Sequence, residues 1–360
     1  MRKKNPPNLP IDAKQNLNYG QCMIFFNKNK AKKPISFTKT LIATAFLALI
    51  LMPSLTSCKK GSQQATPQAA TNTTNSTNEA QAPEENKTKI LATFYPLYVM
   101  LLNITEGTNT EVSMIAPANT GCLHDYQLTT KDMQAIEKCD ILVANGAGME
   151  DFLEKALEAK KDSTIIASQG YNLIEENPHI WVSPSGAIWQ VKQIAEGLKK
   201  LDPQNASAYE KNATSYAEKI QELSDTMHSE LEGLKGKSVI TFHEAFPYFS
   251  SEFGLNTVAV VEREPGTEPS ARELADLVAL IKDAKTKGSK VPMLFAEPQY
   301  SSSAAEVIAN ETGIKVQELD PAVTGPFGKD GTDSDTLQTK ESYLNAMRKN
   351  LEVLKSNLAD

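Results

Sequence analysis

Short apolar runs that alternate with helical patterns most constrain how this chain can fold. Most of the predicted strands are followed by a stretch in which apolar residues recur every three or four positions. We expect strands at residues 89–95, 111–117, 139–146, 163–168, 238–242, 257–261, 292–297 and 315–319, and helices at 129–138, 149–159, 245–253, 270–287, 301–311 and 339–357. Alternation of this kind favours βα units and a mainly parallel sheet.

The longest predicted helix, at residues 203–234, interrupts this alternation. Asp202 suits the N-cap and Pro203 the first helical position. The apolar stripe comprises Ala206, Tyr209, Ala213, Tyr216, Ile220, Leu223, Met227, Leu231 and Leu234. At 1.5 Å per residue this helix would be ~48 Å long. We therefore predict an α/β protein of two lobes, each with a mainly parallel sheet flanked by helices, joined by one long rigid interlobe helix. The predicted boundaries are an N-terminal lobe at 88–201, the connecting helix at 202–235 and a C-terminal lobe at 236–360.

The first 57 residues have the layout of a secretory signal peptide of the lipoprotein type. Lysines precede the apolar run 41–52, which is shorter than the ~20 residues that a membrane-spanning helix needs. The run ends near Leu-Thr-Ser-Cys, which resembles a bacterial lipobox with Cys58 as the lipidated residue. The alternative is a plain signal peptide with an incidental cysteine. Because the apolar run begins late in the chain, the translation start at residue 1 is open to misassignment, and Met23 is an alternative initiator.

Residues 58–87 read as the lipidated cysteine followed by a flexible tether. Gln, Asn, Thr, Ala and Pro dominate this segment, and it has no aromatic residue. The formal net charge of the chain is −7, and the lysines and arginines concentrated before residue 40 make the remainder still more acidic. An anionic body argues against nucleic acid as a partner, because phosphate binding needs basic patches.

Histidines at strand ends are the residues most suggestive of chemistry. The chain has four histidines. His124, His179 and His243 fall in loops beside predicted strand ends, whereas His228 lies on the long helix and off its apolar stripe. Asp320 also follows a predicted strand. Ligands of open α/β sheets bind outside the carboxyl ends of the strands, so these positions suit metal donors. The alternative is that each is a solvated or capping residue, and spacing alone does not show that they converge.

From about Lys89 to the C-terminus the chain resembles the metal-binding receptors of bacterial ABC importers, the cluster that takes up zinc and manganese. The motifs that carry this resemblance are HDYQLTTKDMQAIEKCDILVANGAGMEDFLEK (124–155), NPHIWVSP (177–184), TFHEAFPYFSSEFGL (241–255), EPGTEPSARELADLV (264–278), FAEPQYSS (295–302) and ELDPAVTG (318–325). The resemblance implies that His124, His179, His243 and Asp320 are the metal ligands and that the long helix is the family's rigid interlobe helix. It also implies a monomeric, extracytoplasmic receptor on the cell surface or in the periplasm, with an ABC importer permease as partner.

Zinc is the predicted metal. Three imidazoles and one carboxylate suit tetrahedral Zn²⁺, whereas Mn²⁺ favours oxygen donors. In the family that the chain resembles, a histidine at the position of His243 goes with zinc and a glutamate with manganese. Binding requires neutral histidine, so affinity should fall below pH ~6.5. A manganese or iron receptor of the same family and a surface adhesin are alternatives.

A secreted zinc hydrolase is the rival from another class, because Glu244 follows His243 as in the start of an HExxH motif. Pro247 stands where the second histidine would be, so we do not predict an enzyme.

Cys122 and Cys139 allow a disulfide outside the cytoplasm, but the helix predicted between them would separate them by ~14 Å, beyond bridging distance. We rank a role for Cys122 as an extra metal ligand below the disulfide. Glu297 is interpreted as a structural residue, and a minor role near the cleft stays open.

Overall fold

The computed structural model describes residues 87–123, 126–261, 269–288, 291–299, 303–326 and 336–357. The predicted signal peptide, Cys58 and nearly all of the tether lie outside the described residues, as does His124. Within the described part of the chain, no helix is long and apolar enough to cross a membrane.

The first sheet has four parallel strands. They are β1 (Thr88–Ala92), β2 (Thr110–Met114), β3 (Ile141–Ala144) and β4 (Thr164–Ile166), in the order β2-β1-β3-β4. Every residue of β3 is buried, as expected of a strand covered on both faces. The order reverses between β1 and β3, and such a switch point is where ligands of open α/β sheets bind.

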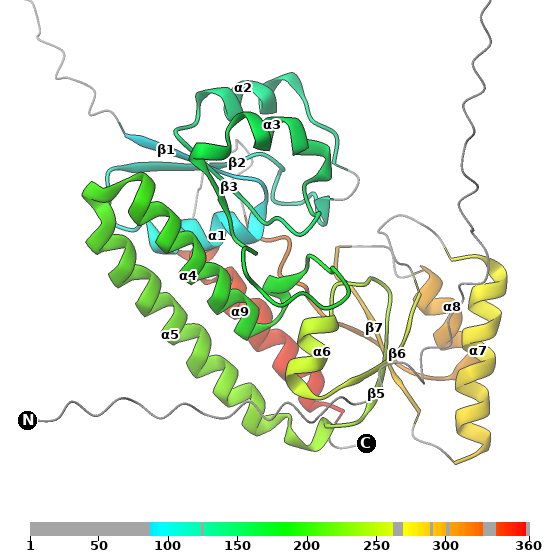
Figure 1. Cartoon of the computed structure of the whole chain (residues 1–360). Coiled ribbons are helices and arrows are strands. Elements are labelled where there is room, and N and C mark those ends of the chain that lie inside the picture. Colours follow the sequence, from blue (N-terminus) through cyan, green and yellow to red (C-terminus); the bar gives the residue numbers. More distant parts are fainter. Residues whose placement is uncertain are drawn as a thin grey trace, which may run out of the picture. The chain divides into compact units, whose positions relative to one another are not determined.

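The second sheet repeats this topology. Its strands are β5 (Ser238–Thr241), β6 (Asn256–Val260), β7 (Met293–Ala296) and β8 (Val316–Glu318), in the order β6-β5-β7-β8, again all parallel. Its switch point lies between β5 and β7. The predicted α/β class with two parallel sheets is therefore confirmed (Figure 1).

Helices flank both sheets. The α-helices of the described residues are α1 (Tyr95–Ile104), α2 (Thr130–Lys138), α3 (Glu154–Ala159), α4 (Pro184–Leu201), α5 (Ala206–Glu230), α6 (Pro247–Phe253), α7 (Ala271–Thr286), α8 (Ser303–Thr312) and α9 (Thr336–Lys355). Capping boxes fix two of the helix starts: Thr129 and Asp132 exchange hydrogen bonds at α2, and Ser270 and Glu273 do so at α7.

The long helix is shorter than the sequence predicts. The α-helical part, α5, has 25 residues, or ~38 Å, and 3₁₀ turns at Pro203–Asn205 and Glu232–Leu234 flank it. Asp202 precedes Pro203 as expected, but its carboxylate accepts a hydrogen bond from the Tyr209 hydroxyl at 2.6 Å and caps no backbone N–H. The helical pattern therefore continues through turns that are too tightly wound to count as α-helix.

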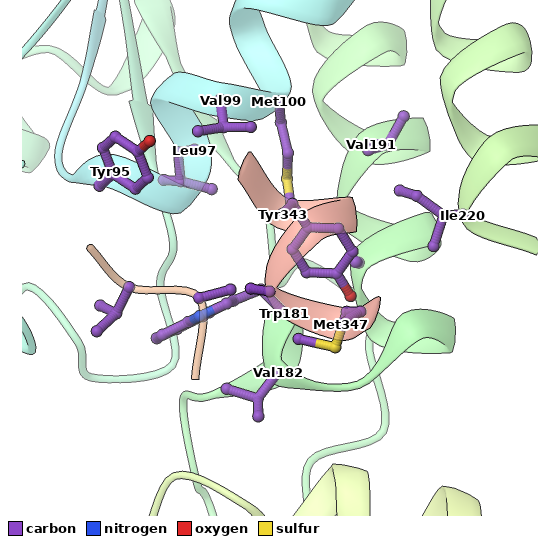
Figure 2. Packing of buried hydrophobic residues seen from close by; sticks show 14 of the residues in the cluster. Tyr95, Leu97, Val99, Met100, Trp181, Val182, Val191, Ile220, Tyr343 and Met347 are labelled. Carbon is purple, nitrogen blue, oxygen red and sulfur yellow. The ribbon is translucent and has the colours of Figure 1, made fainter. Parts of the chain in front are cut away.

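The link between the lobes includes more than α5. Helix α5 packs against α4 and α9, and α9 also packs against α1 of the first lobe (Figure 1). One continuous core contains Ile90 of the first sheet together with Val239 and Phe295 of the second. Figure 2 shows part of this core, in which Met100 of α1, Ile220 of α5 and Tyr343 of α9 gather near Trp181. Because both lobes share this core, a wide hinge motion would expose buried apolar surface.

Candidate metal centre

Three buried side chains converge where strands of the two sheets end. They are Cys122, His179 and His243, which we call the donor cluster, and one ligand atom from each lies within 4.8 Å of the others. Cys122 lies in the loop after β2, His179 immediately before the 3₁₀ turn Ile180–Val182, and His243 two residues after β5. The first two come from one lobe and the third from the other. Two of the four predicted ligands are therefore brought together.

His179 is oriented by Asn177. The Nδ1 atom of His179 lies 3.0 Å from Oδ1 of Asn177, and the same oxygen accepts the backbone N–H of His179 at 2.9 Å. The side-chain amide of Asn177 donates to the backbone carbonyl of Glu244 at 2.8 Å, which connects the two loops that carry the histidines. On the other side of the ring, Nε2 lies 3.3 Å from Sγ of Cys122. The contact through Nδ1 thus presents Nε2 to the cluster.

His243 is held in the same manner by Glu297. Its Nδ1 lies 3.0 Å from Oε1 of Glu297, which follows β7, so the contact spans the switch point of the second sheet. Both side chains are almost completely buried. Histidine ligands of metals generally give their second ring nitrogen to a carboxylate or carbonyl in this way. Sequence reasoning left Glu297 as mainly structural; its position directly after a strand was the signal for this role.

The pKa of His243 is raised. Burial lowers it, but hydrogen bonds and charge interactions with Cys122 and Glu297 outweigh burial and raise the pKa to about 10. In the metal-free protein the imidazole therefore keeps its proton at neutral pH. A metal ion must displace that proton to bind, since a ligating imidazole is neutral.

Asp320 follows β8 and lies outside the donor cluster among the described residues. Its Oδ1 accepts the backbone N–H of Ala322 at 2.8 Å, and its backbone pairs with the side chain of Asn350. Burial raises the pKa of Asp320, with a further contribution from the charge of Glu297. The indole Nε1 of Trp181 donates to the carbonyl of Pro321 at 2.9 Å, and this bond connects the His179 segment to the Asp320 loop.

A buried carboxyl supports the first lobe behind His179. Glu150 accepts hydrogen bonds from the Thr93 hydroxyl at 2.7 Å and from the backbone N–H groups of Asn145 and Gly146 at 2.7 and 2.9 Å. Burial nevertheless raises its pKa to about 7. Asn145 in turn donates from its side chain to the carbonyl of Pro178 at 3.0 Å, next to His179.

Gly146 occupies a position that only glycine fits. Its φ is +77°, and a Cβ there would approach Cγ2 of Ile166 to 2.5 Å. The Asn-Gly-x-Gly-x-Glu segment found in the sequence is therefore a structural support for the loop before His179.

His228 lies apart from the donor cluster. Its side chain is 45% exposed, with Nε2 3.7 Å from Glu252, and its ring packs on Phe253.

No disulfide joins Cys122 to Cys139. The Sγ of Cys139 instead donates to the carbonyl of Ile136 at 3.2 Å, within a separate apolar cluster. The two thiols are not bonded to each other and lie in different apolar clusters, so the disulfide alternative does not hold, whereas Cys122 lies among the donors.

The fold and this centre define a two-lobed α/β binding protein with imidazole and thiol donors buried where the lobes meet. Comparison with known proteins agrees with that class. Residues 90–357 match the family model described as ZnuA, zinc-uptake complex component A, periplasmic. The chain belongs to this family.

Individual relatives are similar over most of the described chain. The chain is 30% identical to the zinc-binding protein AdcA of Streptococcus pyogenes in an alignment 310 positions long, and the match covers 78% of this chain and 58% of that protein. It thus spans little more than half the length of that relative.

Two solved structures have the same fold. One is the zinc-bound ZnuA-like domain of Streptococcus pneumoniae AdcA, with 31% identity, a TM-score of 0.64, and coverage of 76% of this chain and 100% of that one. The other is the binding protein FpvC of Pseudomonas aeruginosa in complex with manganese, with 30% identity, a TM-score of 0.66, and coverage of 76% and 99%. The two likenesses support the two-lobe architecture, and the two metals show that this fold alone does not set which metal is bound.

Proposed function

We propose that the protein is an extracytoplasmic receptor that captures Zn²⁺ between its two lobes and delivers it to an ABC-type importer. The observation that carries this proposal is the pair of buried histidines from different lobes, each presenting Nε2 to the donor cluster through a contact of its Nδ1. Such oriented imidazoles are the usual ligands of zinc in proteins. The zinc-binding relatives and the family description support the same function.

Zinc is favoured over manganese because imidazole nitrogens make up most of the proposed ligand set. Mn²⁺ prefers several oxygen ligands, whereas the buried carboxylate of Glu297 contacts Nδ1 of His243 and so orients a nitrogen donor. His124 and Asp320 stay in the proposed ligand set, His124 outside the described residues and Asp320 on the loop bonded to Trp181. A manganese or iron receptor is the alternative within the same family.

The anchor and the partners follow from the sequence. We propose that Cys58 carries the lipid, that residues 58–87 tether a monomeric body to the membrane, and that the signal segment 1–57 directs export. The proposed division into lobes at 88–201 and 236–360, with the connecting helix at 202–235, fits the two sheets. Adhesion to other cells is not needed to account for any feature of the described residues.

The proposed role is binding and not catalysis. Glu244, the acid of the HE pair, enters the donor region through its backbone carbonyl, which accepts from Asn177. Metal analysis of protein purified without chelator tests the proposal, because a receptor should retain one zinc per chain and hydrolyse neither peptides nor esters. Protein that purifies without zinc and takes up none when zinc is added would contradict it.

A further inference from the structure

Cys122 is a buried thiol in direct contact with a donor histidine. Its side chain is buried, with 7% of the residue exposed. Its Sγ lies 3.3 Å from Nε2 of His179 and within the 4.8 Å cluster that includes His243. On its other side, Sγ donates a weak hydrogen bond to Sδ of Met149, a residue of the apolar core, at 3.9 Å. The thiol therefore stands between the apolar core and the two imidazoles.

We propose that Cys122 is a zinc ligand, bound as the thiolate, together with His179 and His243, which leaves one position of a tetrahedral centre to the other proposed ligands. This inference rests on the proposed function and extends it, since the family resemblance assigns no ligand at this position. Zinc–sulfur and zinc–nitrogen bonds are ~2.3 and ~2.0–2.1 Å long, so a tetrahedral centre separates the two ligand atoms by about 3.6 Å. The observed 3.3 Å between Sγ and Nε2 needs only a small adjustment to match.

The other described cysteine shows what a structural thiol looks like in this protein. Cys139 is equally buried, at 7%, but its Sγ donates to the backbone carbonyl of Ile136 and lies 3.9 Å from Nζ of Lys160. It belongs to no cluster of donors among the described residues. The two cysteines thus differ in surroundings and not in burial, which makes Cys139 a matched control.

A thiolate would strengthen the preference for zinc. Sulfur donors suit zinc and are poor ligands for manganese, which favours oxygen. The specificity of the centre would then depend on Cys122 as well as on His243. Removal of the sulfur should therefore weaken zinc binding more than manganese binding, and the ratio of the two affinities should fall by at least about tenfold.

X-ray absorption at the zinc edge tests this assignment on the whole, zinc-loaded chain. We expect one sulfur neighbour at ~2.3 Å in the wild type and in Cys139→Ser, and its replacement by a nitrogen or oxygen neighbour at ~2.0–2.2 Å in Cys122→Ser. Where Cys122→Ser fails to fold, a sulfur neighbour present in both the wild type and Cys139→Ser supports the assignment, and a wild-type spectrum without sulfur overturns it.

The two proposals fail in different ways. A wild-type spectrum of bound zinc with nitrogen and oxygen neighbours alone would overturn the role of Cys122 and leave the receptor function standing. A sulfur signal that persists in Cys122→Ser and disappears in Cys139→Ser would also overturn it. Wild-type protein that binds no zinc would overturn both proposals together.

Discussion

The rings of His179 and His243 lie with their centroids 4.8 Å apart and their planes at 88°, although one follows the first sheet in the chain and the other is built on the second. A metal ion bound to both therefore connects the two lobes directly. Each ring is fixed on its outer side, His179 by Asn177 and His243 by Glu297. The two imidazoles are thus preorganised before metal arrives, which lowers the cost of ordering them on binding.

Replacing His179 with alanine should abolish tight zinc binding. The change removes a ligand atom and also the ring that contacts Cys122 and His243. We expect a loss greater than the about 10- to 100-fold that removal of a supporting residue causes. Calorimetric titration with zinc measures it, with His228→Ala as the matched control because that half-exposed ring lies outside the donor cluster. Equal losses in the two variants would refute the ligand assignment.

Glu297→Gln should weaken zinc binding by about 10- to 100-fold without removing a ligand. The carboxylate of Glu297 contacts Nδ1 of His243, and an amide would hold the imidazole less firmly and make it less basic. The control is Glu311→Gln on the same lobe, where an exposed carboxylate pairs with Lys282. The account is wrong on this point when zinc affinity in Glu297→Gln equals that of the control variant.

The buried Glu150 should make stability depend on pH. Burial raises its pKa from 4.5 to about 7, so the folded state keeps the proton that the unfolded chain loses. The stabilisation is complete below pH ~4.5 and is lost as the pH rises to ~7, by about 3 kcal/mol at most.

Urea unfolding of wild type and Glu150→Gln across this range measures the effect, because the glutamine cannot ionise. The difference in stability between the two should shift in favour of the variant as the pH rises. Glu137→Gln, an exposed change, should follow the wild type. A difference between wild type and Glu150→Gln that does not vary with pH would show that Glu150 titrates alike in both states.

Zinc should leave the overall dimensions of the protein nearly unchanged. The two lobes share one core, which includes Trp181 and the packed faces of α1, α5 and α9. Opening a wide hinge would expose that apolar surface to water. Small-angle scattering with and without zinc should therefore give the same radius of gyration within error, and a marked compaction would mean that the lobes do swing.

The sequence predicted the strands of both sheets but missed two helices. The eight expected strands are present, because short apolar runs bounded by loops identify buried parallel strands. Helix α1 was missed because nearly all of its residues are buried, so it has no polar face to reveal a helical period. Helix α4 did carry signals, since Ser183 caps it and Pro184 follows at its first position.

The candidate site was predictable only in part. His179 and His243 stood out because they fall in loops beside predicted strand ends, where ligands of parallel sheets bind. Cys122 did not, because its role depends on loops that converge only through the packing of the two sheets; Glu297 follows a predicted strand, but its contact with His243 depends on the same convergence. Local spacing along the chain contains no information on that convergence, whereas the resemblance to metal receptors pointed to the right loops.

Titration of metal-stripped protein with zinc, and separately with manganese, tests the central claim most directly. We predict saturation at one zinc per chain and an affinity for manganese lower by at least about tenfold, equivalent to ~1.4 kcal/mol. Manganese binding as tight as or tighter than zinc binding would contradict the assignment of a zinc centre built mainly on imidazole nitrogens, and the absence of saturable zinc binding would contradict the receptor function itself.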